Sequence, residues 1–147
     1  MAGIKRILHA TDFSKASARA LQEAVKLAKE NSARLLVVHV IEPTPYVAGG
    51  EFGAEIYMKL EDAAKRNAQS SMSRLMQRLK KLKIKAESLL LRGAAHEQIV
   101  KAAKSRKADI VVIGTHGRTG LSKLFLGSVA GKVVSLATCP VMTVRGK

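Results

Sequence analysis

Residues 114–128 read GTHGRTGLSKLFLGS, a glycine-rich stretch between the apolar, strand-like residues 108–113 and the helix-like residues 128–137. Glycine tolerates positive φ angles and lets a ligand approach the backbone closely. A turn of this kind at the start of a helix presents free N–H groups to an anion. Arg118 and Lys123 add two cations within the same stretch. The stretch therefore predicts a phosphate-binding turn and a nucleotide site, although glycines can also serve only to form a turn.

Two better-known phosphate motifs are not found in the sequence. Residues 127–133, GSVAGKV, approach a P-loop but are one residue short and end in Val instead of Ser or Thr. No G-x-G-x-x-G follows the first expected strand, which argues against a dinucleotide fold of the usual kind. The pattern that the sequence does contain is G-x2-G-x9-G-[ST], formed by Gly114, Gly117, Gly127 and Ser128.

Strand-like and helix-like segments alternate along the whole chain. Apolar, β-branched runs predict strands over residues 4–10, 33–41, 84–91, 108–115 and 141–145. Apolar residues at helical spacing predict helices over 20–28 (after start signals at 11–14), 56–82, 95–105 and 127–137, with a Pro- and Gly-rich loop over 42–54. This order predicts an α/β fold: a single domain, 1–147, with an open parallel five-stranded sheet and helices on both faces.

Three separated segments are expected to meet at one edge of that sheet. Ligands of open parallel sheets bind beyond the carboxyl ends of the strands. Asp12, Val40 and Gly114 all fall at or just past such strand ends. Asp12 can also be a simple helix cap, a role that is compatible with ligand contact. His9 and His39 lie in apolar runs, where a structural role is expected.

The charge balance adds a second hypothesis. The 147 residues include 26 Lys and Arg against 11 Asp and Glu, so the formal net charge is +15, which attracts polyanions. Aromatic residues make up only 3% and Trp is absent, so stacking platforms for single-stranded nucleic acid are scarce. Nucleic-acid binding therefore stays the lesser alternative. No apolar run is long enough to span a membrane, and the lone Cys139 suits a reducing compartment, so a cytoplasmic protein without membrane contact is expected.

The glycine pattern, the opening ILHATDFS of residues 7–14 and the LLVVHVIE of residues 35–42 together resemble the universal stress protein family. The resemblance extends over residues 4–144. It implies a Rossmann-like fold of the adenine-nucleotide α-hydrolase type, with strand order 3-2-1-4-5. The family has members that bind ATP and members that do not, and the intact glycine pattern resembles the binding kind.

Carried onto this sequence, the resemblance implies a site for an adenine nucleotide, ATP with or without Mg²⁺. Asp12, close to Ala10, would lie beside ribose or adenine, and the backbone of Val40 would pair with the adenine edge. The ribose and phosphates would be held by Gly114, His116, Gly117, Gly127, Ser128 and Val129. Arg118 and Lys123 either contact the phosphates or project into solvent. Family members are often homodimers through the last strand, here Val141, Met142, Thr143 and Val144. An apolar edge strand gains protection from such pairing.

The function that follows is an ATP-dependent stress-response or signalling dimer. Hydrolysis needs a positioned water, charge stabilisation and usually a metal, yet the glycine stretch contains no Asp or Glu. We therefore expect nucleotide binding with at most slow hydrolysis. The alternative of a true slow ATPase would rely on Asp12 or His116, and His116 could equally contribute only its backbone. Gly127→Val is expected to abolish ATP binding while leaving the fold intact.

Overall fold

The computed structural model describes residues 3–44, 53–116 and 126–146. Strands and helices alternate along these residues as the hydrophobic pattern predicts. The elements are β1 (Arg6–Ala10), α1 (Lys15–Asn31), β2 (Arg34–Ile41), α2 (Gly53–Lys81), β3 (Ala86–Arg92), α3 (Ala95–Ser105), β4 (Ile110–Gly114), α4 (Ser128–Leu136) and β5 (Val141–Val144). None of the helices in these residues is both long and apolar enough to cross a membrane.

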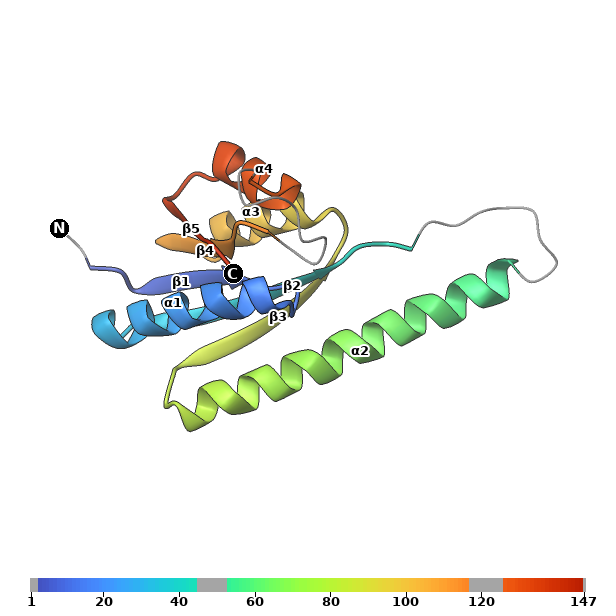
Figure 1. Ribbon diagram of the computed structural model, residues 1–147, viewed down its shortest axis with the longest axis horizontal. Coiled ribbons are helices and arrows are strands. Elements are labelled where there is room, and N and C mark those ends of the chain that lie inside the picture. Colours follow the sequence, from blue (N-terminus) through green and yellow to red (C-terminus); the bar gives the residue numbers. More distant parts are fainter. Residues whose placement is uncertain (1–2, 45–52, 117–125, 147) are drawn as a thin grey trace.

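The five described strands form one parallel sheet in the order β3-β2-β1-β4-β5. This confirms the predicted fold class and the strand order that the family resemblance implied. The order reverses at β1, which pairs with β2 on one side and with β4 on the other. In Figure 1 the strands run from left to right, so that their carboxyl ends gather at the right of the sheet.

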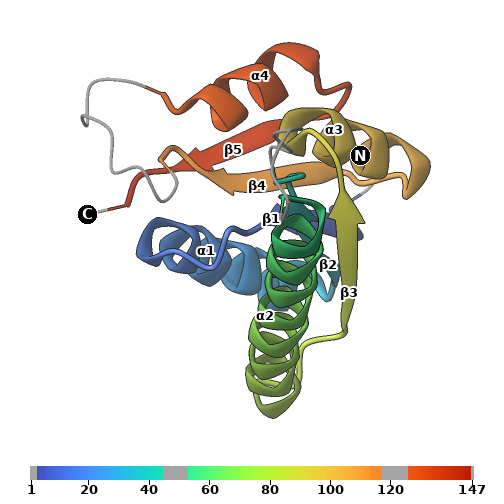
Figure 2. The same ribbon diagram turned by 90° about the vertical axis from the view of Figure 1, so that its right-hand side faces the viewer.

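Helices α1 and α2 cover one face of the sheet, and α3 and α4 cover the other (Figures 1 and 2). Alternate residues of β1 serve the two cores, because successive strand side chains point to opposite faces. Ile7 packs in the core under α1 and α2, whereas Leu8 and Ala10 pack under α3 and α4. Helix α1 can lie close to the sheet because its buried face is built from Ala20, Ala24 and Ala28.

The predicted boundaries differ from the structure by one or two residues at several elements. Strands β1, β3 and β4 each begin two residues later than expected, and just before β4 a side chain bonds to the start of β1. The Asp109 carboxylate accepts the backbone N–H groups of Lys5 and Arg6, both at 2.9 Å. These bonds hold the pKa of Asp109 below its ordinary value. The predicted loop is also too long, since Gly53 and Ala54 already belong to α2, where Glu55 complements the helix dipole in the first turn.

Three helices end at the amino edge of the sheet with the same backbone turn. Ser32, Lys83 and Lys107 each have φ between 50° and 59°, the left-handed region that usually takes Gly. At each end the N–H of the next residue closes back onto the helix, as in the bond from Ala108 N to the carbonyl of Ala103 at 2.9 Å. Carbonyl groups in the last turns of α1, α2 and α3 thus accept hydrogen bonds from backbone N–H groups of the residues that follow each helix.

Candidate functional site

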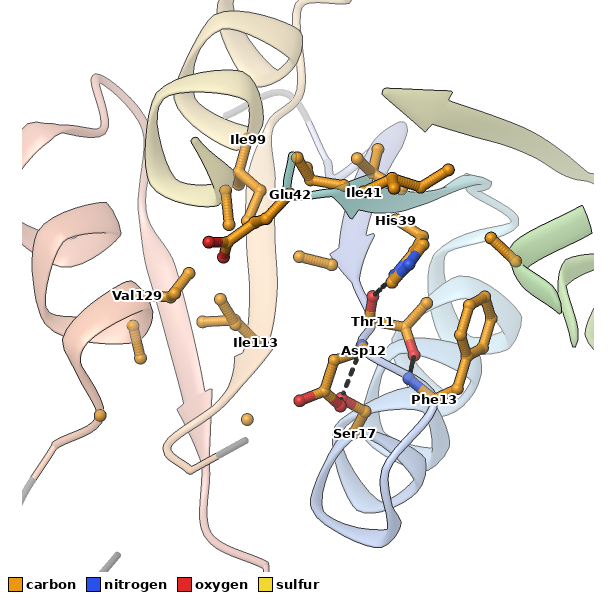
Figure 3. Close-up of a pocket in the computed structure, with 18 of the residues that line it drawn as sticks. Thr11, Asp12, Phe13, Ser17, His39, Ile41, Glu42, Ile99, Ile113 and Val129 are labelled. Atoms are coloured by element: carbon orange, nitrogen blue, oxygen red, sulfur yellow. Dashed lines mark hydrogen bonds between the residues drawn. The ribbon is translucent and has the colours of Figure 1, made fainter. Parts of the chain in front are cut away.

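A cavity of about 690 Å³ opens at the carboxyl ends of β1, β2 and β4. Helix α2 walls one side of it, and the starts of α3 and α4 wall the other. Figure 3 shows the segment after β1 facing α4 across this space, with the side chains of Asp12 and Glu42 directed into it. The cavity therefore lies where the strand order reverses, the place expected from the sequence.

Eight of the predicted site residues line this cavity although they come from four separate segments. They are Ala10, Asp12, Val40, Gly114, His116, Gly127, Ser128 and Val129. The other predicted residues, Gly117 and Arg118, lie outside the described residues, as does Lys123.

Asp12 is held in place by the start of α1. Its Oδ1 accepts the backbone N–H of Ser14 at 2.9 Å and the hydroxyl of Ser17 at 2.6 Å. The same Ser17 hydroxyl accepts the N–H of Asp12 at 3.1 Å. Ser14 is the N-cap residue and accepts the N–H of Ser17. Asp12 thus supports the helix start, where Ser14 is the N-cap, and it also lines the cavity, so the two positions are compatible; contact with a ligand stays a prediction.

Three cavity residues beside Asp12 were not predicted. Thr11 offers its carbonyl to the Nδ1–H of His39 at 2.7 Å, and its hydroxyl to the N–H of Phe13 at 3.0 Å. The rings of Phe13 and His39 are in contact, with centroids 4.5 Å apart and their planes tilted by 41°. Phe13 has φ 63°, an unfavourable angle for a bulky residue that persists only where the surroundings fix it. The pattern of apolar residues gave no sign of this cluster, and His39 was expected to be only structural.

His9 behaves differently from His39 although both lie on strands. Its side chain is fully buried outside the cavity, and its Nδ1–H donates to the carbonyl of Val112 at 3.0 Å. Burial lowers the pKa of His9 from 6.5 to about 4, against smaller opposing effects of the Val112 bond and of Asp12. The imidazole is therefore neutral at physiological pH, with the Nε2 lone pair in the core.

Gly127 brings the end of the glycine-rich stretch against the end of β4. Its N–H donates to the carbonyl of Thr115 at 2.6 Å, and a Cβ at Gly127 would lie only 2.8 Å from that same oxygen. Gly114 is also confined, since a Cβ there would lie 3.3 Å from the carbonyl oxygen of Ala16. A side chain at Gly127 therefore requires a local shift of the backbone, so Gly127→Val would disturb the packing at this point as well as the ligand site. The absence of a side chain at Gly127 is thus required for the packing of α4 against the end of β4, apart from any part it has in ligand binding.

Three helices begin at the cavity. The first residues of α1, α3 and α4 follow the carboxyl ends of β1, β3 and the glycine-rich stretch, and Ser17, Ala95 and Ser128 all line the space. The N-cap residue of α4 is Gly127, which has no side chain that could accept the first N–H groups of this helix. The positive ends of helix dipoles and their N–H groups favour an anion at this place.

The cavity is also lined by polar side chains away from the start of α1. They include Glu42, Asn67 and Ser71. His116 lies with its Nδ1 2.9 Å from the hydroxyl of Thr115. Within residues 3–44, 53–116 and 126–146, no group of three or more His, Cys, Asp or Glu side chains is placed to hold a metal ion. Apolar lining residues such as Val40 of β2 and Ile99 of α3 lie in the same cavity as the start of α4 at Ser128, and ligand sites commonly combine an apolar lining with a few polar groups.

Comparison with known proteins places the chain in one family. Residues 3–145 match the model of the universal stress protein family. A universal stress protein of Thermus aquaticus is 41% identical over 96% of this chain and 98% of its own length. Universal stress protein A homolog 1 of Coxiella burnetii is 36% identical over 95% of each chain. The solved structure of UspA from Lactobacillus plantarum superposes with a TM-score of 0.87 at 25% identity, over 99% of this chain and 100% of that one. The chain belongs to the universal stress protein family.

Proposed function

We propose that the cavity binds an adenine nucleotide, ATP in the first instance, and that nucleotide occupancy controls a stress-response or signalling role. The observation that carries this proposal is the convergence of eight residues from four segments on one cavity that three helix N-termini adjoin. Solved proteins with this fold include a universal stress protein in complex with cAMP, at a TM-score of 0.75 and 22% identity. Another, from Archaeoglobus fulgidus, is in complex with dAMP, at 0.69 and 23%.

The cavity has a suitable surface for each part of the nucleotide. The base would lie against the apolar residues Val40 and Ile99, with the backbone of Val40 at its edge. Asp12 would accept a ribose hydroxyl, since its carboxylate is directed into the cavity (Figure 3). The phosphates would lie at the start of α4, where Ser128 and the helix N–H groups meet an anion favourably.

Binding with slow hydrolysis at most is the chemistry we infer. Oδ1 of Asp12 already accepts two hydrogen bonds, from Ser14 and Ser17, so this oxygen is engaged at the start of α1 and is poorly placed to take a proton from water. Mg²⁺ would be held mainly by the phosphates, as this ion usually takes few protein ligands.

A homodimer formed through β5 completes the proposal. Strand β5 pairs with β4 and forms an edge of the described sheet, and Val141, Met142 and Val144 are half-buried. Pairing with a second copy would cover this edge. Light scattering after gel filtration should give twice the mass of one chain, and a mass of one chain at micromolar concentration would contradict the dimer.

The test of nucleotide binding is calorimetric titration of the nucleotide-stripped protein with ATP, with and without Mg²⁺. Asp12→Asn keeps the shape and an acceptor for Ser14 but removes the charge, so affinity should fall about tenfold. Asp62→Asn is the matched control, because Asp62 is exposed on α2 outside the cavity. Saturation near one ATP per chain with a selective loss in Asp12→Asn supports the site. No binding by the wild type at several temperatures, or equal losses in both variants, would refute it.

A further inference from the structure

A second cavity of about 640 Å³ lies at the opposite, amino edge of the sheet. It is formed where β1, β2 and β3 begin and α3 ends, at the left of the sheet in Figure 1. Five of its described lining residues are basic, namely Arg6, Arg34, Lys85, Arg106 and Lys107, and all five are exposed. Its apolar lining residues include Ile7 and Leu8 near the start of β1 and Leu35 near the start of β2.

Two of these cations are adjacent in the sheet. Arg6 and Arg34 are register partners on β1 and β2, and like charges at paired positions repel. Among the described residues, no ion pair is formed by either guanidinium. Arg106 alone is neutralised locally, by its bond to Glu87, which is the one acidic residue in the described lining. The nearby Asp109 uses its carboxylate on the N–H groups of Lys5 and Arg6. The cavity is thus strongly positive.

Lys107 is a cation at a position where Gly would be favoured. Its φ of 55° is left-handed, and it lines the cavity immediately after α3. The helix end does not need the charge, because the N–H of Lys107 bonds to Lys104 and that of Ala108 to Ala103. Lys83, at φ 59°, repeats the arrangement after α2. Ser32 adopts the same turn after α1, so the angle itself reflects how these helices end, and Lys107 adds to the cavity a cation that the helix end does not require.

The geometry points to a second anion site here, one that binds a chain of linked phosphates without bases, such as inorganic polyphosphate. The exposed cations line a cavity of about 640 Å³ that opens to solvent. The described lining contains no aromatic side chain, so it offers nothing on which a nucleic-acid base could stack. A phosphate chain requires only cations, and these are what the cavity supplies.

This site is independent of the nucleotide cavity. Arg6 lies at the start of β1, whereas Ala10 lies at its end and lines the other cavity. Substitutions of Arg34 and Lys85 should therefore leave ATP binding unchanged, and a failure of either proposal can be recognised without the other.

The experiment is calorimetric titration of the full chain with inorganic polyphosphate at low and moderate salt, followed by ATP on the same samples. In the double variant Arg34→Gln, Lys85→Gln, polyphosphate affinity should fall about tenfold and the salt dependence should become shallower. The control, Lys26→Gln with Lys101→Gln, removes the same charge from exposed helix positions outside the cavity. It should bind like the wild type.

Three outcomes would overturn the proposal. One is the absence of polyphosphate binding at low salt. Another is an equal loss in the two double variants, which would mean that only the net charge attracts the anion. The third is tighter binding of a single-stranded oligonucleotide with the same number of phosphates, which would make nucleic acid the ligand. A selective loss for polyphosphate in the cavity variant supports the site.

Discussion

The N–H of Gly127 donates to the carbonyl of Thr115 at 2.6 Å, and that same oxygen leaves no room for a side chain at Gly127. A Cβ would lie 2.8 Å from it. Because the clashing atom is backbone, Gly127→Ala must shift either the end of β4 or the start of α4. We expect a loss of about 1–3 kcal/mol in the free energy of unfolding, measured by urea denaturation, together with weaker ATP binding.

Gly131→Ala is the matched control for that prediction. Gly131 lies within α4, and among residues 3–44, 53–116 and 126–146 a Cβ there would meet only Leu126 Cδ2, at an ordinary 3.7 Å. Alanine is favoured over glycine inside a helix, so this variant should gain about 0.5–1 kcal/mol. Equal stability of the two variants would contradict the close contact between Gly127 and Thr115.

The buried His9 predicts a loss of stability in mild acid. Its pKa in the folded protein is lowered to about 4, so between pH 6.5 and 4 the unfolded chain binds a proton that the folded chain does not. The stability that this difference represents is complete above pH 6.5 and is lost as the pH falls. Linkage gives a loss of about 2.5 kcal/mol between about pH 7.5 and about pH 4.5.

His9→Asn tests this prediction. The Asn amide can replace Nδ1–H as the donor to Val112, but it does not titrate. Urea midpoints at the two pH values should show a smaller acid loss in the variant, by about 2.5 kcal/mol, even if it is less stable at neutral pH. The carboxylates are common to both proteins and cancel in the comparison. The same acid loss in both would show that His9 is protonated in the folded state.

Much of the fold follows from the local spacing of apolar residues along the chain. Runs such as residues 35–41 are apolar on both faces, and α1 repeats Ala at intervals of four, so both elements could be predicted from spacing alone. The strand starts could not, because the group that takes the N–H of Arg6 is the side chain of Asp109, 103 residues away. Such bonds depend on strand order and register, which periodicity does not encode.

The candidate site likewise contains residues that the sequence could predict and residues that only the folded chain shows. The glycine pattern and Asp12 are visible in sequence because each belongs to a local strand-to-helix turn. His39 was missed because its bond to the Thr11 carbonyl exists only once β1 and β2 are paired with Ala10 opposite Val38. Phe13 gave one weak signal, a bulky residue in a turn, but its positive φ is a property of the folded chain.

Lys107 gives the last prediction, in which stability and binding change in opposite directions. With φ at 55°, a lysine costs about 1–2 kcal/mol relative to an ordinary conformation, whereas glycine adopts this angle freely and loses about 0.5–1 kcal/mol through its more flexible unfolded state. Lys107→Gly should therefore raise the free energy of unfolding by about 0.5 kcal/mol, measured by urea denaturation. The variant also removes one cation from the amino-edge cavity, so polyphosphate affinity should fall while ATP affinity stays constant.

Lys104→Gly is the control, because Lys104 lies inside the last turn of α3, where glycine destabilises the helix. Reduced stability in Lys107→Gly would mean that the lysine side chain makes a favourable contact that outweighs the cost of its backbone angle, and unchanged polyphosphate affinity would contradict its place in the proposed anion site.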